Sequence, residues 1–150
     1  MTLIVAYPCA ERHAMTPSQL LRIASGISLL FAAGHTLGGV QSWSPMGDND
    51  VFKAMNTVRF ETMGANRSYL DLYVGFGWTI SVALLLQTVV LWQMAGLARS
   101  DASQLRPMIA AFAVATLISG LIAWRFIFLV PALFSLALLM ALVGAHNAAR

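Results

Sequence analysis

His35 is the residue in this chain whose type and position first suggest chemistry. It lies in residues 34–39, which read GHTLGG, within a stretch that is otherwise apolar enough to cross a membrane. An ionisable side chain inside a membrane span is costly unless it faces protein or water. We therefore expect His35 to face a protein interior or a wet cavity.

Two further charged residues are predicted at a similar depth. Asp71 lies about one turn into the second apolar segment, and Arg125 lies where the third and fourth segments meet. With four alternating spans, all three residues belong to the outer layer of the bundle. We predict an outward-facing polar pocket there, with His35 and Asp71 at its centre and ligand contacts from Thr36, Arg67, Tyr73 and Arg125.

Two kinds of function fit such a pocket. In the first, a binding or accessory membrane protein holds a lipid-like or amphiphilic ligand, a small apolar ligand or a partner helix. In the alternative, an intramembrane enzyme uses His35 as a base whose tautomer is fixed by the Asp71 carboxylate. No HExxH, GxSxG or glycine-rich phosphate motif completes a known catalytic set.

Metal and cofactor chemistry has little support in the residue types. A single cysteine, Cys9, excludes an internal disulfide or a thiolate metal cage, and the carboxylates do not cluster. A lone histidine in a span can ligate haem axially, so haem remains an alternative. The other histidines, His13 and His146, lie outside the predicted core, and we predict no metal or cofactor.

The composition shows what kind of protein positions these residues. Of 150 residues, 59% are hydrophobic and 10% are charged, with a mean hydropathy of +0.74, whereas soluble domains are about one quarter charged. The net charge is +3, but the basic residues stand singly at the edges of apolar segments. This pattern is typical of membrane anchoring and not of nucleic-acid binding.

The apolar segments predict an all-α fold, a bundle of four transmembrane helices in one domain at 17–150. Thr16, Pro17 and Gln19 form a helix-start signal, a capping box with proline at the first helical position. Residues 108–144 would rise about 55 Å as one helix, too far for one crossing, so the chain turns near Arg125. The predicted spans are 18–40, 69–97, 107–124 and 128–146, after a disordered extension at 1–16 in which Met15 is an alternative start.

The connection between the first two spans is long. An apolar stripe over residues 51–63 predicts a short amphipathic helix on the membrane surface or over the pocket. A mobile loop is the alternative.

Glycines and basic residues bear on assembly and orientation. Gly34 and Gly38 form a GxxxG step that can serve the bundle or a homo-oligomer. Four spans place both termini on one side, with five basic residues there against four on the other, namely Arg12, Arg22, Arg99, Arg106 and Arg150 against Lys53, Arg59, Arg67 and Arg125. This margin favours cytoplasmic termini in a plasma membrane.

Two motifs resemble a small bacterial family of four-span membrane proteins. One is GHTLGG at residues 34–39, and the other is RSYLDLYVGFG at residues 67–77, entering the second span. The resemblance covers residues 17–144 and implies a four-span fold in the bacterial inner membrane, but no activity. In size and span number the chain is also similar to membrane glutathione transferases, whose arginine and asparagine motif in the first loop it lacks.

Overall fold

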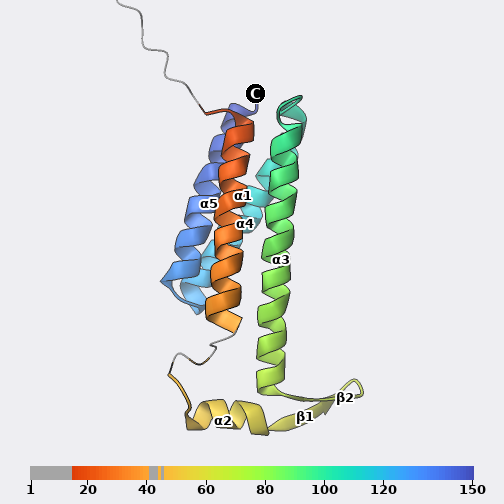
Figure 1. The fold of residues 1–150 in the computed structure, drawn as a ribbon, viewed down its shortest axis with the longest axis vertical. Helices are drawn as coiled ribbons and strands as arrows, with labels where there is room; N and C mark the ends of the chain where they lie inside the picture. The colour runs from red at the N-terminus through yellow and green to blue at the C-terminus, as the bar shows by residue number, and fades with distance from the viewer. Residues whose placement is uncertain (1–14, 41–43, 45) are drawn as a thin grey trace, which may run out of the picture.

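The computed structural model describes residues 15–40, 44 and 46–150 of the chain (Figure 1). It is an all-α bundle with one small hairpin, which confirms the predicted fold class. Most of the predicted extension at 1–16 lies outside the described residues. The elements in chain order are α1 (Pro17–Gly34), the π-helical turn η1 (His35–Val40), α2 (Asp50–Thr57), β1 (Arg59–Thr62), β2 (Ala65–Ser68), α3 (Tyr69–Leu97), the short 3-10 helix η2 (Ser103–Leu105), α4 (Arg106–Phe126) and α5 (Leu129–Ala148).

Four helices in the described part of the chain are long and apolar enough to cross a membrane. They are Pro17–Gly38, Tyr69–Leu97, Ser103–Phe126 and Leu129–Ala148. The predicted start signal is present, because Thr16 caps α1 and the Gln19 side chain accepts from the Thr16 backbone N–H at 2.9 Å. The four long apolar helices indicate a multi-pass membrane protein.

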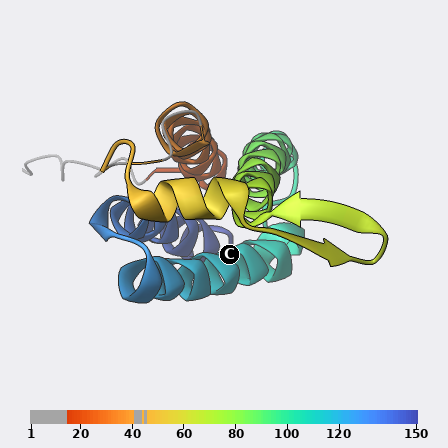
Figure 2. The ribbon, with the colours of Figure 1, turned by 90° about the horizontal axis from the view of Figure 1, so that it is seen from below.

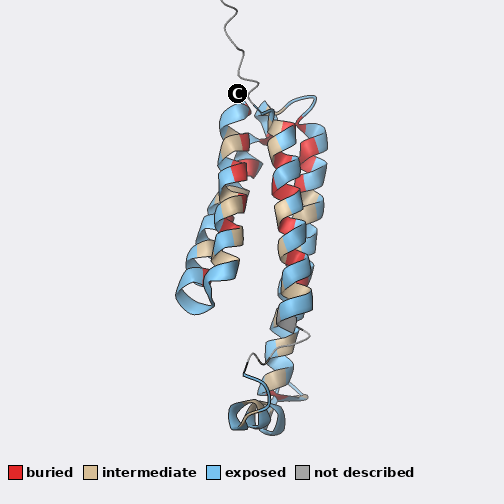
Figure 3. Cartoon of the chain, turned by 60° about the vertical axis from the view of Figure 1, so that its left-hand side comes forward, coloured by how far each residue is buried: buried red, intermediate tan, exposed pale blue. Residues whose placement is uncertain are grey.

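The four long helices alternate in direction, so the start of α1 and the end of α5 lie at the same end of the bundle (Figure 1). Helix α1 packs against α3 on one side and α5 on the other, and α4 packs against α5. The buried core lies at the end near the termini (Figure 3). It includes Leu21, Leu91, Met94, Ile109 and Leu142.

The connection between α1 and α3 crosses the opposite end of the bundle (Figure 2). A surface helix is present, as predicted, but it ends at Thr57 and not at residue 63. Strands β1 and β2 follow as an antiparallel hairpin in which Phe60 pairs with Arg67. The turn residues Met63 and Gly64 have φ angles of 50° and 78°, as in two-residue turns that match the twist of the strands. The predicted extent of the helix was therefore wrong.

Candidate functional site

His35 lies in the contact between α1 and α3. Its Nδ1 is 3.1 Å from the Oγ of Ser81, and the Thr36 hydroxyl is 2.9 Å from the same oxygen. The Ser81 hydroxyl lies 3.3 Å from the carbonyl oxygen of Gly77, and the Thr36 hydroxyl lies 2.8 Å from that of Ala32. Each hydroxyl has one proton to share among these contacts, and a lone pair of Ser81 remains to accept from Nδ1 of His35. We therefore assign a proton to Nδ1. Both predicted residues therefore contribute to helix packing.

The contact belongs to a polar seam along the whole of α1. Ser18 donates to the carbonyl oxygen of Ala95 at 2.6 Å, and Ser25 donates to that of Thr88 at 2.9 Å. One turn further along, Ser28 donates to Leu84 at 3.3 Å and accepts from Gln87 at 3.2 Å. The seam residues of α1, together with the first residue of η1, recur at alternating intervals of three and four, as in a coiled coil, and are Ser18, Leu21, Ser25, Ser28, Ala32 and His35.

The structure does not bring His35 and Asp71 together. His35 contacts α3 at Ser81, ten residues beyond Asp71, which corresponds to about 15 Å along a helix axis. Helix α3 has 29 residues and is about 43 Å long, whereas the hydrocarbon core is about 30 Å thick. Asp71 therefore lies at a different depth from His35, and a direct acid–base pair between them is not formed.

Asp71 instead organises the start of α3. Its Oδ2 accepts from the backbone N–H of Ser68 at 2.8 Å, while the Ser68 hydroxyl accepts from the backbone N–H of Asp71 at 3.1 Å. The same Oδ2 is 3.9 Å from Nη2 of Arg59 on β1. This reciprocal capping box satisfies two backbone donors. Arg59, which was not predicted as a site residue, is placed here by the hairpin.

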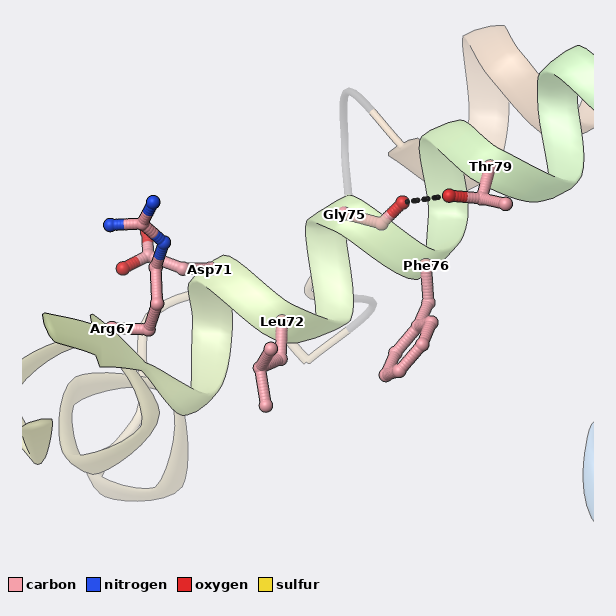
Figure 4. A pocket seen from close by; sticks show the side chains of 6 residues that line it. All are labelled: Arg67, Asp71, Leu72, Gly75, Phe76 and Thr79. Carbon is pink, nitrogen blue, oxygen red and sulfur yellow. Dashed lines mark hydrogen bonds between the residues drawn. The ribbon is translucent and has the colours of Figure 1, made fainter. Parts of the chain in front are cut away.

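A groove of about 460 Å³ runs along this end of α3 (Figure 4). Arg67 and Asp71 form its polar end, and both are labelled in Figure 4. The Arg67 Nη1 also donates to the carbonyl oxygen of Asn66 at 3.0 Å. The rest of the lining comes from one face of α3 and consists of Leu72, Gly75, Phe76 and Thr79. The groove thus joins a charged end to a largely apolar wall.

The other predicted ligand contacts lie elsewhere. Tyr73 is exposed on α3 and is not part of the groove lining. Arg125 is exposed in the last turn of α4, where its guanidinium stacks over the Phe126 ring at 5.1 Å. Of the six predicted site residues, Arg67 and Asp71 share the groove, and His35 and Thr36 share the Ser81 network.

Metal ligands and the glycine step were also part of the sequence predictions. In residues 15–40, 44 and 46–150, no three histidine, cysteine or acidic side chains are grouped to hold a metal ion. His146 lies beside Arg106, 3.4 Å from its Nη2. At Gly34 and Gly38, an added Cβ would meet nothing within 4 Å. Packing among the described residues therefore does not use this face, and the homo-oligomer contact stays a prediction.

Two sets of residues were missed by sequence reasoning. Ser81 was not singled out, although serines at positions 18, 25 and 28 already repeat with the period of a coiled-coil seam. The groove residues Leu72 and Phe76 carry no signal that separates them from other lipid-facing side chains. The charged neighbour of α3 is known only from the hairpin, in which Arg59 of β1 pairs with Ser68, the last residue before α3.

Comparison with known proteins adds no family to this description. No family model, curated protein or solved structure matches the chain. The resemblance to a bacterial four-span family therefore stays a prediction, and function is argued from the geometry alone.

Proposed function

We propose that the protein binds a lipid-like amphiphile at the groove on the amino-terminal end of α3. The observation that carries this proposal is that Arg67 and Asp71 line the same groove as Leu72 and Phe76. Such a groove offers a polar end for a headgroup and an apolar wall for the hydrocarbon that follows. A soluble polar metabolite would gain nothing from the apolar wall.

The charges favour a phosphate-bearing headgroup. Arg67 lines the groove together with Asp71, and Arg59, which lies outside the lining, is 3.9 Å from the Asp71 carboxylate. Two guanidinium groups therefore lie near the one carboxylate of the groove lining. Guanidinium groups bind phosphate oxygens through charge-assisted hydrogen bonds. Both contacts of the Asp71 carboxylate use Oδ2, so Oδ1 is placed to accept from a headgroup hydroxyl or ammonium group.

The depth of the groove supports the same ligand. Helix α3 exceeds the hydrocarbon thickness by about 13 Å, and its aromatic residues Tyr73 and Trp78 lie within the same stretch, 67–79, that lines the groove. Tyrosine and tryptophan are enriched at the level of lipid headgroups. The polar end of the groove then lies at headgroup level, and Phe76 and Thr79 lie nearer to the acyl chains.

Retention of lipid by purified protein tests the proposal. Wild-type protein and the variants Arg67→Gln and Arg99→Gln would be transferred to nanodiscs containing phosphatidylglycerol, and bound lipid would be counted by native mass spectrometry. Losing one hydrogen bond to a charged group costs about 1.5–3 kcal/mol, so we expect Arg67→Gln to weaken retention about ten-fold or more. Arg99 lies at the other end of α3, so Arg99→Gln is the matched control.

The outcomes separate specific from general lipid binding. Equal losses in Arg67→Gln and Arg99→Gln would mean that any surface arginine attracts anionic lipid, and would contradict a site at the groove. A loss confined to Arg67→Gln, with a further loss in Arg67→Gln combined with Phe76→Ala, is the expected result. The enzymatic alternative is not proposed further, because His35 contacts α3 at Ser81, about 15 Å along the helix from Asp71.

We further propose that the protein lies in a bacterial inner membrane with both termini in the cytoplasm. The support is the margin of basic residues at the ends of the spans. Labelling of Ser100→Cys and Thr62→Cys in intact cells, each in a Cys9→Ser background, tests the orientation. We expect an impermeant maleimide to react with the cysteine at position 62 and to spare the one at position 100.

A further inference from the structure

A second concave site lies between α4 and α5, well away from the charged groove. Its volume is about 130 Å³, and its lining contains no ionisable residue. The lining consists of Thr116, Leu117, Gly120 and Leu121 of α4 with Ala132, Ser135, Leu136 and Leu139 of α5. The two helices come close at Gly120, where an added Cβ would stand 3.0 Å from the Cβ of Ser135.

Thr116 and Ser135 distinguish this cavity from ordinary helix packing. Their exposed fractions are 6% and 5%, so both are more than nine-tenths buried. Other hydroxyls in the spans, such as those of Thr79 and Thr88, donate to the carbonyl oxygen four residues earlier. Among the described residues, the Thr116 and Ser135 hydroxyls have no such bond. Neither oxygen is fully enclosed by protein atoms, because the one enclosed side-chain polar atom without a partner in the described residues is Nδ1 of His146.

An unpartnered hydroxyl in this setting is unfavourable. Thr116 is ten residues from each end of α4, or about 15 Å from both, and so lies near the middle of the membrane. No bulk water is available at that depth to satisfy a hydroxyl. A hydroxyl moved from water into an apolar medium without a hydrogen-bond partner is destabilising. Two such groups on facing helices therefore point to a missing acceptor.

We propose that this cavity binds a neutral, apolar molecule that carries a carbonyl oxygen and enters from the hydrocarbon core. The absence of ionisable groups in the lining disfavours a charged ligand. The apolar leucine and alanine walls favour a hydrocarbon ring or chain, and the two hydroxyls supply donors for the oxygen. A dry cavity of about 150 Å³ holds a benzene-sized molecule, so the cavity between α4 and α5 suits one six-membered ring or a short chain segment.

The expected binding is tested with two probes that differ in one functional group. They are a difluorinated cyclohexanone and the difluorinated cyclohexane that lacks the carbonyl. Binding to full-length protein in nanodiscs, relative to empty nanodiscs, would be measured by fluorine NMR. Because one hydrogen bond contributes about 1 kcal/mol net, we expect the wild type to bind the ketone about five-fold more tightly than the hydrocarbon.

Variants of the two hydroxyls assign the preference to the cavity. Thr116→Val keeps the shape of the side chain and removes its hydroxyl, and Ser135→Ala does the same on α5. We expect the double variant to bind both probes equally, whereas Thr116→Ser keeps the ketone preference. Ala132→Leu fills the cavity and is expected to abolish binding of both probes.

Other outcomes overturn the inference. Equal affinity of the two probes for the wild type would show that the cavity between α4 and α5 binds through its apolar walls alone and that its hydroxyls do not bind the carbonyl oxygen. A ketone preference that survives in the double variant would place the carbonyl elsewhere, and no binding of either probe would show that the cavity takes no such ligand. Arg67→Gln is expected to leave probe binding unchanged, so failure here is distinguishable from failure of the lipid site on α3.

Discussion

The Nδ1 of His35 lies 3.1 Å from the Oγ of Ser81. This distance joins an ionisable residue near the end of the first span to a buried hydroxyl of α3. It makes His35 the last member of a seam in which serine hydroxyls of α1 donate to backbone carbonyl oxygens of α3. In a membrane, where apolar side chains gain little by leaving lipid for protein, such hydrogen bonds and close packing hold helices together.

Removing the Ser81 hydroxyl is expected to weaken the bundle. In Ser81→Ala, the His35 N–H loses its acceptor in a buried contact, and the free energy of unfolding should fall by about 1 kcal/mol. Ser119 is an exposed serine in the middle of α4, so Ser119→Ala is the matched control. Unfolding in detergent micelles by titration with sodium dodecyl sulfate measures both variants. Equal stability of the two would show that the seam bond contributes nothing.

The sequence predicted the fold well because a membrane span is a composition signal. About 20 apolar residues suffice to indicate each helix, and the four predicted spans agree closely with the helices. The predicted pocket depended on relative depth, which composition does not report. Asp71 was placed level with His35, but α3 continues for 29 residues, so its first turns extend past the end of α1.

The hairpin was missed for a local reason. A two-residue turn is usually indicated by Asn-Gly or Asp-Gly, whereas here Met63 occupies the first left-handed position, with φ 50°. Met63 instead fitted the apolar stripe of a longer helix. The error matters for the site, because the hairpin brings Arg59 back to Asp71.

Close packing at Gly120 gives a second stability prediction. A side chain here meets the Cβ of Ser135 at 3.0 Å, so Gly120→Val should force α4 and α5 apart and cost about 1–3 kcal/mol. Gly26 has nothing within 4 Å of an added Cβ, and valine has a better helix propensity than glycine. We therefore expect Gly26→Val to keep or raise the thermal midpoint in the same detergent. A similar loss in both variants would contradict close packing at Gly120.

The turn between α3 and α4 should respond to acid. Hydrogen bonds from Ser103 and Gln104 lower the pKa of Asp101 below its ordinary value. Because the folded-state pKa is the lower one, the carboxylate stabilises the turn at pH values above its unfolded pKa, and this contribution is lost as the pH falls through the folded pKa. The protection factor of the Gln104 amide, in which the intrinsic pH dependence of exchange is divided out, should therefore fall on acidification. Asp101→Asn should show a lower protection factor already at neutral pH and a flatter response.

The cap on α3 links stability to the proposed ligand site. Ser68 is 1% exposed, and its hydroxyl accepts from the Asp71 backbone N–H while the Asp71 carboxylate accepts from the Ser68 N–H. Ser68→Ala removes half of this capping box and should cost about 1 kcal/mol, with faster amide exchange in the first turn of α3. Ser100, which donates to the carbonyl oxygen of Leu97, provides the control Ser100→Ala just beyond the other end of the same helix.

Because Ser68 fixes the chain between Arg67 and Asp71, we expect Ser68→Ala also to reduce phosphatidylglycerol retention, by less than Arg67→Gln does. Retention that is unchanged while exchange accelerates would mean that the headgroup site does not depend on an ordered first turn.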